Sequence, residues 1–140
     1  MKNTLRVFAL FTGGVVCGSA QLQQPLVANV PFPFIAGEKR LPPGEYRINP
    51  GPTPGSVTIR SEEGKLQYFL LTQTSESARG ATDSVLVFHR YGDQYFLSAL
   101  RLKGERIGAG FLTTNAEKRV AHSSGDPAAV ALALNKPRGR

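Results

Sequence analysis

The sequence predicts an all-β protein, either a single antiparallel β-sandwich or a small barrel of about seven strands, with a short C-terminal helix. Three observations lead to this fold class. Short segments of alternating apolar and polar residues recur at roughly ten-residue spacing, and Gly- and Pro-rich turns separate them. No heptad or internal repeat is present. The chain has 140 residues. Removal of the expected twenty-residue signal leaves about 120 residues, enough for one hydrophobic core but too few for two separate domains.

The strongest element is a hairpin over residues 84–102. Two apolar runs flank Gly92-Asp93, the chemistry of a two-residue II′ or I′ turn. In that register His89 faces Phe96 and Val87 faces Ser98. One face then carries Leu86, Phe88, Tyr95, Leu97 and Ala99, and the other carries Val85, Val87, Phe96 and Leu100. Both faces are apolar away from the turn, so we expect the ribbon to be covered on both sides.

The first twenty residues have the pattern of an export signal. A basic start precedes an apolar run over residues 7–16, and Gly18-Ser19-Ala20 offers the small residues that a signal peptidase reads. We expect cleavage after Ala20, a secreted or periplasmic location and no stable membrane span after signal removal. Cys17 is the only cysteine, so the mature chain has no disulfide. The chain thus divides into a signal peptide (1–20), a β-domain (21–112) and a helical or flexible basic tail (113–140).

The remaining strands follow from residue alternation. Residues 26–35 are predicted to form one edge strand. Pro31 and Pro33 both lack a backbone N–H on the same side of this strand, so that side would be unpaired. A Pro-Pro-Gly turn leads into a strand with Tyr46 and Ile48 inward. A charged turn joins strands over 56–61 and 66–72, a polar loop is expected over 73–83, and residues 108–112 form a weaker strand.

The tail carries two candidate elements. Thr114 and Glu117 have the spacing of a capping box, which predicts a short helix to about His122. Residues 128–134 follow a second capping signature but also alternate, so the pattern fits either a helix or a strand.

The formal net charge of +7 does not indicate a nucleic-acid-binding protein. Residues 21–112 hold ten Lys and Arg against eight Asp and Glu, and the excess lies in the signal and the tail. No basic face with interleaved aromatic residues is visible on a strand. We therefore expect no nucleic-acid partner. A glycan, a lipid or an envelope protein remains a possible partner.

The sequence offers little catalytic chemistry. Metal sites need three or four converging ligands, and the mature chain has only His89 and His122 besides its acids, most of which lie in turns. No metal and no cofactor are expected. Ser98 is placed on the same hairpin face as His89, but Val87 is its direct partner and Phe96 intervenes along its own strand. No catalytic residue is therefore assigned, and the protein is predicted not to be an enzyme. A serine or an acid beside His89 in a cleft would instead favour a hydrolase.

Tyrosines near the hairpin turn are the candidate binding residues. Tyr91, Tyr95 and Arg90 flank the turn, and Tyr68 lies on the strand over 66–72. Such residues stack on sugar rings or line ligand pockets, although they also cap a core. We expect a non-catalytic exported domain that acts as a structural or binding module. The alternative is a small barrel that holds a hydrophobic ligand such as a lipid, which needs an unfilled interior of roughly 300 Å³ or more.

Three motifs resemble those of uncharacterised small secreted β-proteins of acidobacteria. They are the VPFPF segment at 30–34, the LPPGEY segment at 41–46 and the RYGDQYFL segment at 90–97. The resemblance spans most of residues 26–122 and implies a compact exported β-domain. It implies no activity and no catalytic residue. The chain departs from this pattern after Leu112, where Thr113-Thr114-Asn115 replaces the Leu-Pro-Lys-Ser-like helix entry.

Overall fold

The computed structural model describes residues 25–51, 53, 55–76 and 79–138, so the expected signal peptide (1–20) lies outside the described residues. The protein is all-β with one short helix near the C-terminus, as the sequence predicts. The described part holds ten strands instead of about seven. They are β1 (Leu26–Val30), β2 (Phe34–Ala36), β3 (Lys39–Leu41), β4 (Gly44–Pro50), β5 (Ser56–Ser61), β6 (Gln67–Glu76), β7 (Val85–Tyr91), β8 (Gln94–Arg101), β9 (Ile107–Phe111) and β10 (Ala128–Ala133), with helix α1 (Asn115–Ser124) before β10.

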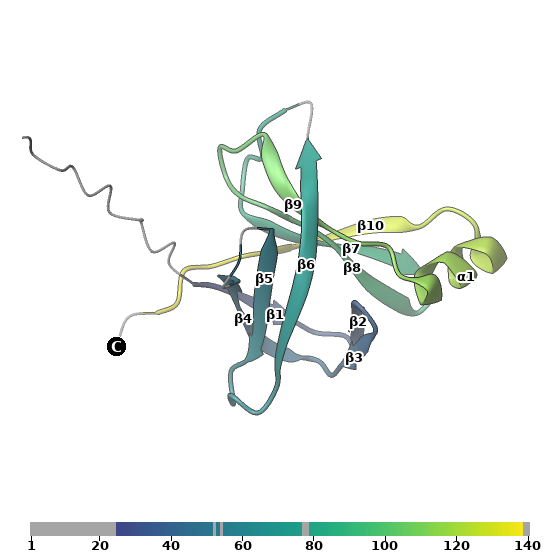
Figure 1. The fold of residues 1–140 in the computed structure, drawn as a ribbon, viewed down its shortest axis with the longest axis horizontal. Coiled ribbons are helices and arrows are strands. Elements are labelled where there is room, and N and C mark those ends of the chain that lie inside the picture. The colour runs from purple at the N-terminus through teal and green to yellow at the C-terminus, as the bar shows by residue number, and fades with distance from the viewer. Residues whose placement is uncertain (1–24, 52, 54, 77–78, 139–140) are drawn as a thin grey trace, which may run out of the picture.

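The strands form one mixed sheet that is not closed into a barrel. Its order is β1-β4-β5-β6-β9-β8-β2-β3, with β7 and β10 added beside β8. Every ladder is antiparallel except that of β2 with β8. Figure 1 shows β4–β6 crossing the direction of β7, β8 and β10, so the sheet folds over onto itself. Among the described residues no helix has the length and apolarity to span a membrane.

The single edge strand predicted over residues 26–35 is wrong. The chain forms β1 on β4, leaves the ladder over Pro31 and Pro33, and then forms β2 on β3 and β8. Each proline lacks the N–H that a ladder requires, so the two prolines divide the segment between two parts of the sheet. Alternate residues of both strands still face the core, since Ala28, Val30 and Phe34 are all buried.

The predicted hairpin is confirmed, since β7 and β8 pair antiparallel and are connected by Gly92-Asp93. Gly92 has φ 62°, and no non-glycine residue of the described chain has a positive φ, which matches a II′ turn. The predicted register holds up to Phe88 opposite Leu97 and then fails. Val87 pairs with Ala99, so Ser98 is the extra residue of a β-bulge.

The bulge also exchanges two side chains between faces. Leu100 pairs with Leu86 and packs against the core, whereas Ala99 is buried outside the main core cluster. The prediction placed them the other way round, because a register slip of one residue moves a side chain to the opposite face. The prediction that both faces are covered is confirmed, since Phe88 is buried on one side and Phe96 on the other.

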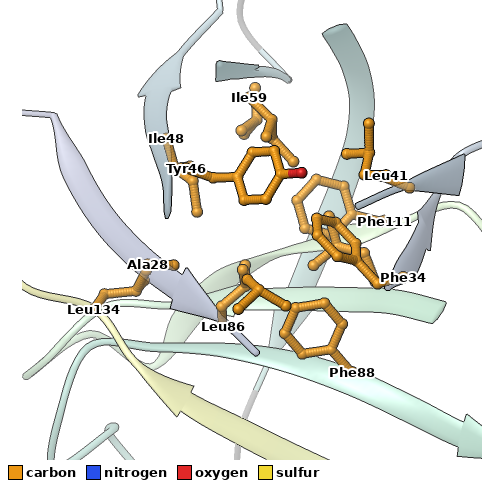
Figure 2. Packing of buried hydrophobic residues seen from close by; sticks show 14 residues of the cluster. Ala28, Phe34, Leu41, Tyr46, Ile48, Ile59, Leu86, Phe88, Phe111 and Leu134 are labelled. Atoms are coloured by element: carbon orange, nitrogen blue, oxygen red, sulfur yellow. The ribbon is translucent and has the colours of Figure 1, made fainter. Parts of the chain in front are cut away.

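The core lies between the crossing parts of the sheet. Figure 2 shows Tyr46 and Ile59, from β4 and β5, facing Leu86 and Phe88 of β7, with Phe34 between them. The ring of Phe34 meets those of Tyr46 and Phe88 edge to face, with centroids 5.3 Å apart in both pairs. Such contacts add to burial and fix the angle at which the two parts cross.

The segment after Leu112 contributes to the fold. Thr114 caps α1 by accepting a hydrogen bond from the Glu117 N–H at 3.2 Å, as the capping signature predicts. Residues 128–133 form β10, which pairs with the free edge of β7. Of the two alternatives that the sequence allowed for this segment, the strand is therefore the one observed. Just after β10, Asn135 exchanges two backbone hydrogen bonds with Val27 of β1.

Candidate functional site

The four predicted binding residues do not come together. Tyr91 is buried on the hairpin face that meets α1, and Tyr95 lies on the opposite face. Tyr68 is half-buried on β6 and packs against the core from the far part of the sheet. Arg90 is exposed beside the turn. No single ligand could touch all four.

Tyr95 is occupied by protein contacts. Its ring stacks on Phe32 with centroids 3.7 Å apart and planes 13° from parallel. The guanidinium of Arg90 lies 5.7 Å from the centre of the same ring, and the Arg90 Nε donates to the Gly92 carbonyl at 2.7 Å. These contacts anchor the turn and leave little of the ring for a ligand.

The structure instead brings three polar side chains into a hydrogen-bonded series that the sequence did not predict. The Ser98 Oγ lies 3.0 Å from the His89 Nε2, and the His89 Nδ1 lies 2.8 Å from the Glu117 Oε1. The three residues come from β8, β7 and α1, so the contact joins the helix to the hairpin. We refer to Ser98, His89 and Glu117 as the relay.

The partners of the imidazole determine its protons. A carboxylate can only accept, so the Nδ1 atom of His89 carries the hydrogen that Glu117 receives. In a neutral imidazole the Nε2 atom is then an acceptor, and the Ser98 hydroxyl donates to it. The carboxylate thus selects the tautomer in which the histidine is a base toward the serine.

The acid of the relay is buried, and the imidazole is partly exposed. The Glu117 side chain is 7% exposed and the His89 side chain is 35% exposed. Tyr91 supplies a second donor to the carboxylate, from its hydroxyl to the same Oε1 at 3.1 Å. Burial raises the pKa of the Tyr91 hydroxyl, and the charge and hydrogen bond of Glu117 raise it further.

Two features hid the relay from the sequence. The bulge displaces Ser98 from Val87 toward His89, and nothing in an alternating strand marks the position of a bulge. Glu117 was assigned to a capping box, in which its carboxylate would reach back to the helix start. The carboxylate instead turns to the sheet, and the signal was only that an acid follows the hairpin at a helix start.

The described residues contain no group of three or more His, Cys, Asp or Glu side chains that could hold a metal ion. The relay contributes two such side chains, one short of a usual protein site.

A cavity of about 330 Å³ lies between the crossing parts of the sheet, at the end away from α1. Its apolar walls include Ile48 and Val57, which are buried, and Leu100 from the far end of β8. Strands β4, β5 and β6 form one side, and β8 and β9 form the other. It lies at the mouth of the folded sheet, a common place for ligands in β-proteins.

A larger depression of about 810 Å³ runs beside β1 and β4. Its lining includes Arg47 and Glu62, which form an exposed ion pair at 2.8 Å, together with Lys136 and Arg138. Despite its size, this charged surface crease lacks the apolar walls that enclose a small ligand. The smaller apolar cavity is the better candidate.

No family model, curated protein or solved structure matches this chain. The fold places it in the broad class of all-β domains with a folded-over, unclosed sheet.

Proposed function

We propose that the chain is an exported binding module whose cavity takes a small ligand with an apolar body. The observation that supports this proposal is the cavity volume of about 330 Å³, which lies within the usual range for small-molecule sites. A fully packed interior of this size of domain would instead favour a purely structural role.

The walls indicate the class of ligand. Leucines from β1 and from the end of β8 supply apolar surface, and amide or hydroxyl groups of Asn49, Gln73 and Thr74 supply a few polar contacts. This combination suits a molecule with an aliphatic or aromatic body and one polar end, such as a short lipid.

The cavity lining favours binding without turnover. Among the described lining residues the one ionisable side chain is Glu105, and the Ser56 Oγ donates to the Thr53 carbonyl at 2.7 Å instead of to a base. At this site the chain binds and releases its ligand unchanged.

Export is supported by the sequence alone. The basic start, the apolar run over residues 7–16 and the small residues before Gln21 have the order of a signal peptide. Mass spectrometry of the protein recovered from an exporting host tests this proposal. The expected mass is that of a chain starting at Gln21, and a full-length mass would contradict it.

The cavity is tested by titration with N-phenyl-1-naphthylamine, a neutral apolar fluorophore. We expect saturable fluorescence enhancement at one probe per chain. Ala109→Phe places a ring against the cavity wall and is expected to weaken probe binding at least about tenfold, since the new side chain occupies the ligand volume.

Leu71→Phe is the matched control, because Leu71 lies on β6 with an exposed fraction of 67%, outside the cavity. It should bind the probe as the unaltered chain does. Equal binding by the Ala109→Phe variant would overturn the cavity proposal. Absence of saturable binding to the unaltered chain would favour a structural module instead.

A further inference from the structure

We propose that Ser98, His89 and Glu117 form a reactive-serine centre that accepts small acyl groups from carboxylic esters. The centre is independent of the proposed cavity, whose lining includes none of these three residues. It supplies a serine and an acid beside His89, at a position outside both cavities described above.

The atoms that meet are those that nucleophilic catalysis requires. The serine contacts Nε2 at 3.0 Å and the acid contacts Nδ1 at 2.8 Å, so the base lies between its proton donor and its orienting group. A histidine that only tied a helix to a sheet would need one of these contacts. The second contact aims the basic nitrogen at a hydroxyl.

The backbone at Ser98 is also outside the sheet ladders. Among the described strand pairs, β8 contacts β2 at Phe96 and β9 from Ala99 onward, and it contacts β7 on both sides of Ser98. Ser98 therefore lies at the bulge and at the point where β2 and β9 separate. Bulges recur beside active sites because they re-aim a side chain and interrupt pairing.

Solvent reaches the imidazole of the relay. The Glu117 side chain of α1 is buried, the His89 side chain is about one-third exposed and Ser98 is half-buried. Burying a carboxylate is costly, and an apolar contact would dock the helix at least as well. The buried acid gains a purpose if it stabilises the imidazolium that forms when Ser98 gives up its proton.

The proposed reaction is ester hydrolysis through an acyl-serine. The Ser98 Oγ bonds to the carbonyl carbon while its proton passes to the His89 Nε2. The bond to the leaving alkoxide then breaks, and the alkoxide takes the proton from Nε2. Water next gives a proton to the same nitrogen and attacks the acyl carbon, and Ser98 leaves with that proton. The products are one carboxylic acid and one alcohol.

Neither of the two cavities described above is lined by Ser98. The proposed substrate is therefore a small acyl ester such as an acetate, which needs no enclosed pocket. The test is labelling of the folded chain with a biotin-tagged fluorophosphonate, which forms an Oγ–P bond and releases fluoride. We expect one adduct per chain, mapped to Ser98 by peptide mass spectrometry, and slow hydrolysis of p-nitrophenyl acetate.

The variants separate a reactive serine from a structural hydrogen bond. Ser98→Ala should lose the adduct and the esterase activity. Glu117→Gln and His89→Gln should slow labelling at least about tenfold, because the base loses its orientation or its basic nitrogen. Ser123→Ala is the matched control, since Ser123 lies exposed at the end of α1 and should not affect labelling.

Labelling of the unaltered protein tests whether Ser98 is reactive. Absence of an adduct at Ser98 in the folded chain, or an adduct on another residue, would overturn the proposal. Labelling of Ser98 at an unchanged rate in both folded Gln variants would overturn the role of the relay. Thermal melts of each variant establish that it is folded.

Discussion

Phe32 and Tyr95 lie face to face, with ring centroids 3.7 Å apart. Phe32 belongs to the proline-rich connection between β1 and β2, and Tyr95 is the second residue of β8. The stack therefore fixes a segment outside the ladders to the strongest hairpin of the fold, and Phe32 also meets Phe88 edge to face at 5.2 Å. Tyr95 therefore has a packing role in the fold, and its binding role stays a prediction.

We predict that Tyr95→Ala lowers the free energy of unfolding by about 2–3 kcal/mol, because it removes a half-buried aromatic ring and its stack. Tyr91→Ala should cost at least as much, since Tyr91 is more deeply buried. Urea unfolding measures both changes. Phe69→Ala is the control, with an exposed ring and an expected change within about 0.5 kcal/mol. Loss of ligand binding by either tyrosine variant without a change in stability would contradict this prediction.

Stability should fall in alkaline solution. Burial raises the pKa of both Tyr46 and Tyr91 in the folded protein. Above the ordinary tyrosine pKa of about 10, the unfolded chain loses these protons before the folded chain does, so the free energy of unfolding decreases as pH rises. The contribution is fully present below that pH and is lost as pH passes the folded pKa values.

Urea unfolding between pH 8 and pH 11 checks this dependence. Tyr91→Phe should reduce the alkaline slope, because phenylalanine cannot ionise. Tyr68→Phe is the comparison, since Tyr68 is only half-buried and lacks the Glu117 contact. An equally steep slope after Tyr91→Phe would show that Tyr91 does not contribute.

Gly108 is required by a close approach of two strands. A Cβ atom at Gly108 would lie 2.6 Å from the Leu100 carbonyl oxygen, so β9 would have to move away from β8. We expect Gly108→Ala to destabilise the fold by about 1–3 kcal/mol, as other overpacked sites do. Gly44→Ala is the control: Gly44 lies in β4 without a positive φ, and its nearest atom would be 3.9 Å away. Chemical denaturation should show no loss of stability for that variant.

The helix cap is tested at Thr114. Its hydroxyl accepts the Glu117 N–H, so Thr114→Ala should cost about 0.5–2 kcal/mol and speed amide hydrogen exchange in α1. Thr113→Ala, one residue earlier and exposed, provides the comparison and should leave exchange unchanged. Equal exchange rates in the two variants would contradict a capping role.

Local patterns were sufficient for the hairpin turn, the inward side chains of β4 and the helix start. Alternation placed Tyr46 and Ile48 inside, and glycine chemistry placed the hairpin turn at Gly92. Local patterns failed where pairing with a distant segment of the chain decides the secondary structure. Residues 128–133 are a strand because β7 offers an open edge, and no local signal records that edge.

The candidate site depended on two such events. The bulge arises from the pairing of β7 with β8, and it places Ser98 beside His89. The residues around Ser98 carry no sequence signal for a bulge. The turn of Glu117 toward the sheet depends on α1 lying against β7. In the sequence, Ser98 and His89 belong to the hairpin pattern and Glu117 to a capping box, and no pattern links the three residues.

The backbone bonds between Val27 and Asn135 unite the opening and closing segments of the described chain. Contacts of such long sequence separation form late and slow a folding reaction. A nascent polypeptide of this kind cannot complete its native topology until the last strand has left the ribosome.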